Sequence, residues 1–260
     1  MSKHFLGLSL ITTWGSYLKI AVLADIHGNY DALKAVLKNT SDADMYLILG
    51  DLVDYGPEPE QVIDAIKELG CLVVRGNHDH AVAHNVDCRC GVKTHWVSVV
   101  TREVISKKYL SKKNMKYLKE MPLRLELYLN NLKVLLVHAT PSNPLYQYLY
   151  PWEDTEKFFE ALAAWASSRC IDMVLLAHTH YQFIRIVEGV LVLNPGSVGQ
   201  PRDGDPRAAY AIIDTESREV YLRRIKYDVE ATLSKLRKLL SSYRKEYEFL
   251  NKLLLSGLLD

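Results

Sequence analysis

Six short apolar runs, each followed at once by polar or glycine-rich residues, constrain this chain more than any other feature of its sequence. The runs have the length and the aliphatic or β-branched composition of buried strands. They cover residues 19–24, 45–49, 71–74, 133–137, 172–177 and 190–193. In an open α/β sheet, ligands bind at the carboxyl ends of the strands. We therefore expect the polar residues after the six runs to meet at one site.

Helical patterns separate the early runs. Leu33, Val36 and Leu37 repeat at helical spacing after Asn29, which suits a helix cap, and a second such pattern follows a turn with two prolines at 57 and 59. This βαβα alternation predicts that the early strands are parallel and buried. Short turns join the runs at 183–187, 190–193, 209–214 and 220–225, which predicts antiparallel pairing. The predicted fold class is α/β with mixed sheets.

Composition limits the classes of function. The chain has 260 residues, of which 48% are hydrophobic, so it can bury a sizeable core and is not intrinsically disordered. Its 32 Lys and Arg nearly balance its 31 Asp and Glu, so we expect neither specific nucleic-acid binding nor a membrane partner. No apolar run approaches the roughly 18–20 residues of a membrane span. The four cysteines are too few for a disulfide framework.

The first 18 residues are expected to form an extension outside the domain. Residues 4–18 resemble a weak signal sequence, but the nearest small-residue site would place cleavage just before Asp25 and remove the first predicted strand. We therefore predict a cytoplasmic protein.

The residues after the runs have the chemistry of a metal centre. Two pairs, Asp25 with His27 and His178 with His180, are spaced so that both members point the same way from an extended segment. The seven candidate ligands are Asp25, His27, Asp51, Asn77, His138, His178 and His180. Carboxylate, amide and imidazole ligands without thiolates suit Mn²⁺, Fe, Co, Ni or Zn²⁺. Seven ligands exceed the needs of one ion, whereas two ions that share a carboxylate can clamp a phosphoryl group.

Each of these residues also has an ordinary structural explanation. A buried His or Asp is more often a satisfied core or capping group, Asn29 and Asn77 suit helix caps, and Gly50 and Gly76 suit turns. Taken together, such explanations leave open why every one of these strand ends carries a group that can bind a metal.

The ordered motifs resemble those of the calcineurin-like metallophosphoesterase superfamily. They are D-x-H-G-N at 25–29, G-D-x-x-D at 50–54, G-N-H-D at 76–79, the isolated His138 and H-x-H at 178–180. With NPGSVGQPRDG at 194–204, the chain is most similar to the small prokaryotic phosphoesterases related to symmetrical diadenosine tetraphosphatases and Ser/Thr phosphatases. The resemblance implies one domain over residues 19–226, folded as a four-layer sandwich of two mixed β-sheets flanked by α-helices.

The resemblance also implies the role of each ligand and two divalent metal ions as cofactors. One ion would be held by Asp25, His27 and His180, the other by Asn77, His138 and His178, and Asp51 would bridge them. Manganese is the first expectation for these ions, with Fe, Ni, Co and Zn as alternatives.

Two further residues receive catalytic roles from the resemblance. A water activated by the metals would attack phosphorus. His78 would stabilise the transition state and donate a proton to the leaving oxygen, a task suited to a group that titrates near pH 7. Asp54 would orient His78.

The chain departs from the Ser/Thr phosphatase motif G-D-x-V-D-R-G, because Tyr55 replaces the arginine that binds phosphate. A phenol offers one hydrogen bond and no charge, which disfavours phosphoprotein hydrolysis and weakens the assignment to diadenosine tetraphosphate. Arg75 and Arg202 are candidate substrate-binding residues that could compensate. The alternative for each is a solvated surface arginine.

Two segments are left outside this site. The segment 80–95 is expected to form a helical cap, with a structural metal site or a disulfide of Cys88 as alternatives; its metal-competent residues are His80, His84, Cys88, Cys90 and His95. Residues 227–260 are expected to form a helix packed on the domain or used in a homodimer. Its apolar seam is Leu233, Leu236, Leu240, Tyr243, Tyr247, Leu250 and Leu254.

The function predicted from these patterns is hydrolysis of small phosphate esters, of the phosphodiester or nucleotide type, by a dinuclear metal-dependent phosphoesterase. The alternatives are a Ser/Thr-type protein phosphatase, a diadenosine polyphosphate hydrolase and a non-catalytic scaffold of the same fold. A nuclease is disfavoured because the chain has no basic stripe.

Overall fold

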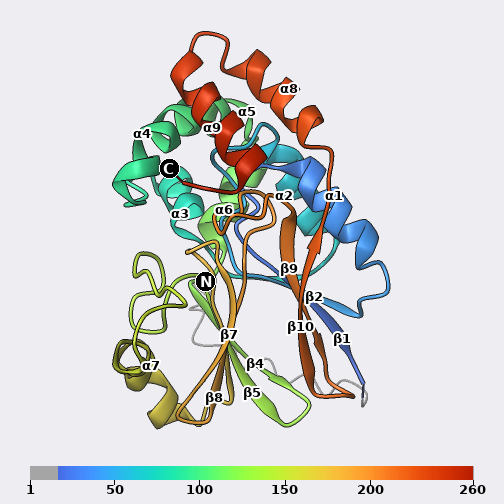
Figure 1. Cartoon of the computed structure of the whole chain (residues 1–260), viewed down its shortest axis with the longest axis vertical. Helices are drawn as coiled ribbons and strands as arrows, with labels where there is room; N and C mark the ends of the chain where they lie inside the picture. The colour runs from blue at the N-terminus through green and yellow to red at the C-terminus, as the bar shows by residue number, and fades with distance from the viewer. Residues whose placement is uncertain (1–16, 260) are drawn as a thin grey trace, which may run out of the picture.

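The computed structural model describes residues 17–259, although for residues 163–169 it describes the backbone alone. Residues 1–16, most of the expected N-terminal extension, lie outside the described residues. Within the described part, the strands form two five-stranded sheets that pack against each other with an apolar core between them (Figure 1).

The first sheet has the strand order β10-β9-β1-β2-β3. Its strands are β1 (Lys19–Leu23), β2 (Met45–Ile48), β3 (Leu72–Val73), β9 (Ala208–Asp214) and β10 (Glu219–Ile225). The three early strands are parallel, as the βαβα alternation predicted, and β9 and β10 add antiparallel pairs at one side.

The second sheet has the order β4-β5-β6-β8-β7. Its strands are β4 (Arg124–Leu129), β5 (Leu132–Val137), β6 (Met173–Leu175), β7 (Gln182–Val187) and β8 (Val190–Pro195). The central β5, β6 and β8 are parallel, and β4 and β7 pair antiparallel at the edges. The sequence patterns had not predicted β4.

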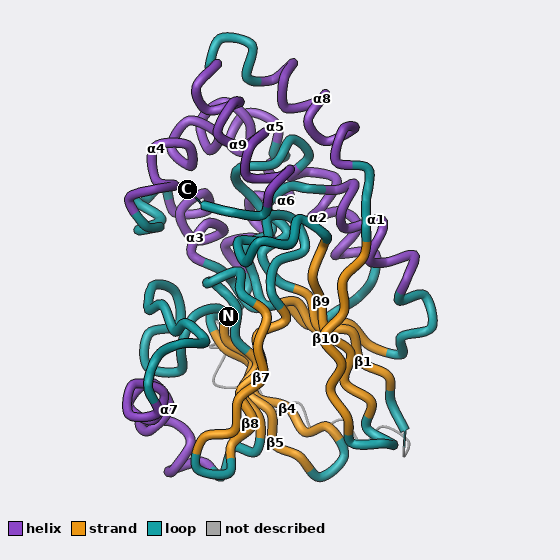
Figure 2. The backbone as a smooth tube through the Cα atoms, viewed as in Figure 1, coloured by secondary structure: helices purple, strands orange, loops and turns teal. Residues whose placement is uncertain are grey.

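Most helices gather at one end of the sheets, whereas α7 lies beside the second sheet (Figure 2). They are α1 (Tyr30–Asn39), α2 (Pro59–Glu68), α3 (Asn77–His84), α4 (Val92–Thr101), the π-helix η1 (Arg102–Ser106), α5 (Lys107–Tyr109), α6 (Lys112–Glu120), α7 (Thr155–Arg169), α8 (Val229–Leu239) and α9 (Arg244–Ser256). Asn29 caps α1 as predicted, because its side chain accepts a hydrogen bond from the Ala32 amide at 3.1 Å.

Alternate residues of the strands face different layers, which confirms the four-layer sandwich. In β1, Ala21 and Leu23 pack in the core beneath α1 and α2, while Ile20 and Val22 pack in the core between the sheets. A third core lies between the second sheet and α7, where Phe158 is fully buried. The order of layers is therefore helix, sheet, sheet, helix.

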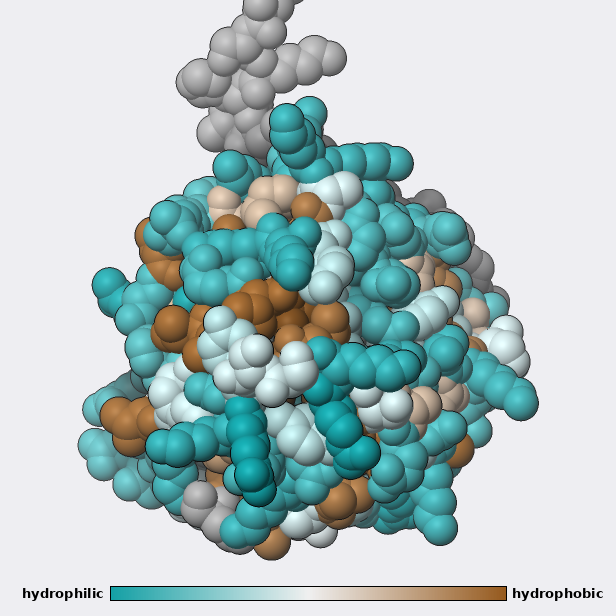
Figure 3. Space-filling view, turned by 90° about the horizontal axis from the view of Figure 1, so that it is seen from above, coloured by the Kyte–Doolittle hydropathy of each residue, from teal (hydrophilic) through white to brown (hydrophobic). Residues whose placement is uncertain are grey.

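The C-terminal segment differs from the single helix predicted for it. The chain turns between α8 and α9, so the apolar seam is folded back on itself. Leu233, Leu236 and Leu250 are buried in one cluster that also contains Tyr55 and other residues of the domain. Figure 3 looks down on this helical end, whose surface is mainly hydrophilic with a smaller hydrophobic group near the middle. None of the described helices is long and apolar enough to span a bilayer.

Candidate metal centre

The seven predicted ligands all follow strand ends, and none is more than 3% exposed. The first sheet contributes Asp25 and His27 after β1, Asp51 after β2 and Asn77 at the start of α3, which follows β3; the second contributes His138 after β5 and His178 and His180 after β6. The structure therefore brings these residues together from the facing ends of both sheets.

The backbone is strained where it presents these ligands. Five of the seven have a positive φ, and they are Asp25 (50°), His27 (49°), Asp51 (55°), His178 (68°) and His180 (65°). A left-handed conformation is uncommon for residues other than glycine, and such outliers cluster at functional sites. These strained residues lie just beyond the carboxyl ends of β1, β2 and β6.

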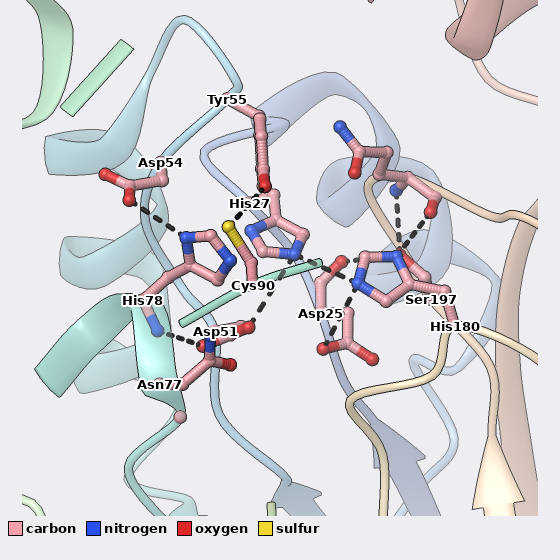
Figure 4. A network of polar contacts seen from close by, with 12 residues as sticks. Asp25, His27, Asp51, Asp54, Tyr55, Asn77, His78, Cys90, His180 and Ser197 are labelled. Atoms are coloured by element: carbon pink, nitrogen blue, oxygen red, sulfur yellow. Dashed lines mark hydrogen bonds and ion pairs between the residues drawn. The ribbon is translucent and has the colours of Figure 1, made fainter. Parts of the chain in front are cut away.

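One group of possible ligands combines the end of β1 with the end of β6. The ligand atoms of Asp25, His27 and His180 all lie within 4.8 Å of one another. Nε2 of His27 faces Nε2 of His180 at 3.3 Å, and Nε2 of His180 is 3.7 Å from Oδ1 of Asp25 (Figure 4). Two imidazoles and one carboxylate thus converge on one point.

A second group lies next to the first and shares Asp51 with it. Asp51, His138 and His178 again offer ligand atoms within 4.8 Å of one another. Oδ2 of Asp51 is 3.3 Å from Nε2 of His138 and 3.8 Å from Nε2 of His27, which belongs to the first group. The amide Oδ1 of Asn77 is 3.0 Å from the same His138 nitrogen. Asp51 therefore lies between the two groups, within 3.8 Å of an imidazole from each.

Several buried polar atoms of these groups have no hydrogen-bond partner in the protein. Both carboxylate oxygens of Asp25 and Nε2 of His178 are buried and unpartnered. Leaving a buried polar group unpaired costs about 1–3 kcal/mol, and more when the group is charged. Divalent cations would satisfy these atoms, and the donor set of carboxylate, amide oxygen and imidazole fits such ions.

Backbone carbonyls hold three of the imidazoles by their other nitrogen. Nδ1 of His27 lies 3.0 Å from the Val53 carbonyl oxygen. Nδ1 of His138 lies 2.7 Å from the Leu49 carbonyl oxygen, and Nδ1 of His180 lies 2.6 Å from that of Gln200. A carbonyl can only accept, so Nδ1 carries the proton, and Nε2 keeps its lone pair in the neutral ring that binds a metal. Metal-ligating histidines are commonly oriented by this kind of contact.

Burial sets the charge state of the site. It lowers the pKa of His27 to about 3 and holds those of His178 and His180 well below the usual value, so these imidazoles are neutral. Burial would also lower the pKa of His138, but the Asp51 charge outweighs it and raises that pKa to about 9. Desolvation raises the pKa of Asp25 to about 7. Nearby cations would offset the cost of ionising this carboxyl group.

His78 lies beside the ligands and is oriented by Asp54. Its Nδ1 is 2.9 Å from Oδ2 of Asp54, and its backbone amide donates to Oδ1 of Asp51 at 2.9 Å. Burial alone would lower the pKa of His78, yet the negative Asp51 and the hydrogen bond to Asp54 raise it above its usual value. The geometry suits a histidine that carries a proton next to the metal ligands.

Asp54 in turn is held by residues that the motifs did not indicate. Arg102 donates to its Oδ2 from Nε at 3.0 Å and from Nη2 at 2.9 Å, and Ser106 donates to Oδ1 at 2.9 Å. Arg102 and Ser106 are the first and last residues of the π-helix η1, a type of helix frequent at functional sites. Residues four apart lie on the same face of a helix, so the spacing of Arg102 and Ser106 could have indicated that they share a partner.

Asp79, the last residue of G-N-H-D, holds the strand ends around the bridging carboxylate. Its carboxylate accepts from the amides of Asp51, Leu52 and Gly76 at 2.8–3.0 Å. A Cβ on Gly76 would lie 2.0 Å from Oδ1 of Asp51, so this position has no room for a side chain. Gly76 is thus more than the turn glycine considered above.

Comparison with known proteins identifies the family. The sequence model of the calcineurin-like phosphoesterase superfamily domain matches residues 18–218. The chain belongs to this superfamily.

Two similar proteins match most of this chain, and a third matches a shorter stretch. An uncharacterised protein of Methanocaldococcus jannaschii is 32% identical over 235 residues, 84% of this chain and 91% of that relative. The crystal structure of a metallophosphoesterase from Sphaerobacter thermophilus has a TM-score of 0.74 and 26% identity, and it covers 93% of this chain and 100% of that one. A symmetrical bis(5'-nucleosyl)-tetraphosphatase of Salmonella paratyphi B is 43% identical over 63 residues, 22% of each chain.

Tyr55, which replaces an arginine of the Ser/Thr phosphatase motif, is buried against the metal ligands. Its ring packs edge to face on His27 at 4.9 Å, and its hydroxyl donates to Sγ of Cys90 at 3.6 Å. Burial raises the pKa of Tyr55 well above its usual value, so the phenol is neutral and adds no charge to the site.

The two candidate substrate-binding arginines differ. Arg202 is only 5% exposed, donates from Nη2 to Gln200 at 2.6 Å and keeps a buried Nε without a partner. Arg75 is less buried, and its Nε also has no partner, but it directs Nη1 to His84 and to the Lys119 carbonyl, both at 3.0 Å. The structure thus gives the Arg75 guanidinium other partners, and its role in substrate binding stays a prediction.

The cysteine-containing segment lies behind His78. Sγ of Cys88 is 2.8 Å from Sγ of Cys90, both thiols are free, and together with His78 they form another group of possible ligand atoms. Asp87, Cys88 and His95 form one more such group. The segment joins α3 to α4, which agrees with the predicted helical cap, and the structural metal there stays an open alternative.

Proposed function

We propose that this superfamily phosphoesterase hydrolyses small phosphate esters of the phosphodiester or nucleotide type with two divalent metal ions, manganese first among them. The proposal rests above all on Asp51, whose Oδ2 lies within 3.8 Å of imidazoles from both ligand groups. A carboxylate shared in this way suits a pair of ions about 3.5–4 Å apart.

Asp25, His27 and His180 would hold one ion, Asn77, His138 and His178 the other, and Asp51 both. When bound, such a pair of ions supplies a water nucleophile at neutral pH and stabilises the charge that develops on a phosphoryl group.

The chain's own residues would supply the rest of the chemistry. His78, fixed at Nδ1 by Asp54, can give a proton to the leaving oxygen from Nε2, which that contact leaves free. Arg202, with an unpartnered buried Nε, can bind a phosphate oxygen by a charge-assisted hydrogen bond. The neutral Tyr55 in place of an arginine supports small esters over phosphoproteins as substrates.

Hydrolysis of dinucleoside polyphosphates is a second candidate. The specific support is the 43% identity over 63 residues to a protein named for the symmetrical cleavage of bis(5'-nucleosyl) tetraphosphate. A non-catalytic scaffold is the remaining alternative, and the presence of every ligand position and of His78 argues against it.

The decisive experiment is an assay of the Mn²⁺-loaded protein against simple phosphate mono- and diesters, nucleotides and dinucleoside tetraphosphates, together with metal analysis. We expect hydrolysis with two ions per chain. His78→Ala should lower kcat by about 10²–10⁴-fold with the same metal content. Tyr109→Ala, which alters a ring that is 46% exposed and belongs to no ligand group, should leave the rate unchanged. Two bound ions without turnover on any substrate would favour the scaffold.

A further inference from the structure

A ladder of stacked aromatic rings leads away from the metal centre. Tyr148, Tyr150 and Trp152 alternate along the segment between His138 and α7, and their rings stack on one another where this segment enters a turn at Trp152. The ring of Tyr148 lies on that of His178 with a centroid distance of 4.0 Å. The ring planes of Tyr148 and Tyr150 are within 9° of parallel, and their centroids are 5.6 Å apart. The rings of Tyr150 and Trp152 make the same angle, with centroids 4.7 Å apart.

The outer end of this ladder is exposed and held in place. Trp152 is 63% exposed, although its inner face is covered by Tyr150. Tyr181, next to the ligand His180, meets Trp152 edge to face at 4.9 Å and Tyr150 at 5.9 Å. The ladder is thus fixed at one end by a metal ligand and presents an indole to solvent at the other.

Arg202 places a positive charge close to the metal ligands. Its Nη2 donates to the Gln200 side chain at 2.6 Å, and the carbonyl of the same Gln200 lies 2.6 Å from Nδ1 of His180. Tyr181, which follows His180 in the chain, contacts the ladder at Trp152. The buried Nε of Arg202 has no partner and is free for an anion.

We propose that the ladder is a nucleobase subsite, in which the exposed indole of Trp152 stacks on the base of a substrate whose phosphate binds Arg202 and the metal centre. This inference deepens the proposed function and rests on it for the position of the reacting phosphate. Stacking of a base on an aromatic side chain contributes about 1–3 kcal/mol and uses the ring face that all bases share. The chain should therefore prefer esters that carry a base, with little discrimination among bases.

Kinetics of Trp152→Ala test this subsite. The variant should lose about 5- to 150-fold in kcat/KM for nucleotide esters, which is the stacking contribution expressed as a ratio, and mostly through KM. Its kcat/KM for glycerol phosphate should stay within about twofold, and Trp152→Phe should retain most of the preference. Trp96→Ala is the matched control, because Trp96 is 40% exposed but packs on Phe249 of α9. Equal losses on both substrates, or no loss on either, would overturn the subsite.

Binding gives a readout that does not need turnover. AMP and ribose 5-phosphate carry the same phosphate, so their affinities for wild type and variants, measured by calorimetry, isolate the base. We expect wild type to bind AMP at least about fivefold more tightly than ribose 5-phosphate. Trp152→Ala should bind the two ligands with equal affinity. Arg202→Met should bind both more weakly than wild type does. Tighter AMP binding that depends on Trp152 in a protein without hydrolytic activity would contradict the proposed function alone. Hydrolysis with equal binding of the two ligands would contradict this subsite alone.

Discussion

His78 owes its orientation to a carboxylate that it shares with a buried arginine. Asp54 is fully buried and accepts from Arg102 and Ser106 while it contacts Nδ1 of His78. A carboxylate held in this way has no freedom to move, so the imidazole that it holds is fixed as well. Asp54 acts through His78 and is a positioning residue.

Replacing Asp54 by Asn should therefore affect turnover more than metal binding. The amide keeps the shape but can no longer offer two charged acceptors, and loss of such an orienting partner typically costs about 10–100-fold. We expect kcat to fall by that amount with KM and metal content close to wild type, and the melting temperature to fall as well because buried Arg102 loses its charged partner. Asp87→Asn is the control, because Asp87 forms an analogous but exposed pair with His95 at 3.1 Å. Loss of metal from Asp54→Asn would instead show that this residue supports the ligands.

For individual residues, the sequence predicts the candidate metal ligands better than the residues that orient the side chains around them. Asp25, His27 and the H-x-H pair stand in short motifs directly after strands, so local spacing suffices to find them. Arg102 reaches Asp54 across 48 residues of sequence, because α4 and η1 fold back over the loop after β2. No local pattern encodes such a contact. The same is true of the ladder, whose alternating aromatic residues were visible but whose stacking on His178 depends on how two loops pack.

Among the secondary-structure elements, α8 and α9 differ most from expectation. The three-and-four spacing of leucines continues through residues 240–243, but the backbone turns there, and Tyr243 donates its amide to the Leu240 carbonyl at 2.8 Å. Hydrophobic spacing reports which residues are buried and does not report whether one helix or two bury them. The five leucines of the predicted seam are buried, but Tyr243 is 37% exposed, Tyr247 is only partly buried, and the single helix was not found.

Leu236 of α8 should be a principal stability determinant of this helical end. It is fully buried in the cluster with Tyr55, Val97 and Ile105. Leu236→Ala should lower the free energy of unfolding by about 2–5 kcal/mol, since it removes buried methyl groups and leaves a cavity. Leu255→Ala, on α9 but 47% exposed, should change it by less than about 1 kcal/mol. Urea unfolding of both variants checks the difference, and equal effects would mean that α8 does not pack as described.

A charged contact between helices should make part of this stability depend on pH. Nζ of Lys235 on α8 lies 2.6 Å from Asp31 of α1 and 2.7 Å from Glu58 before α2. Burial would raise the pKa of Asp31, but its hydrogen bonds to Lys235 and Lys34 lower it below the usual value. A carboxyl group with a lowered pKa stabilises the fold above its unfolded pKa of about 4, and this contribution is lost as the pH falls through the folded value.

Lys235→Met should therefore be less stable than wild type at pH 7, by no more than about 1 kcal/mol because the lysine is partly exposed. The difference should shrink as the pH falls below about 4. Lys238→Met changes an exposed lysine of the same helix and should show little difference at either pH. Urea unfolding at both pH values decides the matter, and a gap that persists in acid would exclude the contribution of Asp31.

Over the whole molecule, both ligand groups take residues from both sheets. The first combines Asp25 and His27 of one sheet with His180 of the other, and the second combines Asp51 with His138 and His178. The sequence predicted that the strand ends converge, because parallel strands end at one edge. It did not predict how the strands divide into two sheets, since that depends on β4 and on the pairing of β9 with β1.

Because each group spans the two sheets, metal ions should hold the sheets together as well as serve catalysis. A ligand that binds only the folded state stabilises it by about 2.7 kcal/mol at a concentration 100-fold above its dissociation constant. The protein treated with a chelator should therefore melt several degrees below the protein saturated with Mn²⁺. In Asp51→Asn this difference should largely disappear, because the shared carboxylate is lost from both groups, whereas Asp42→Asn, which changes an exposed carboxylate outside every ligand group, should respond like wild type. The prediction is contradicted if the chelator does not change the melting temperature of wild type, or if it lowers that of Asp51→Asn by as much as that of wild type. Either result would show that bound metal does not stabilise the contact between the two sheets.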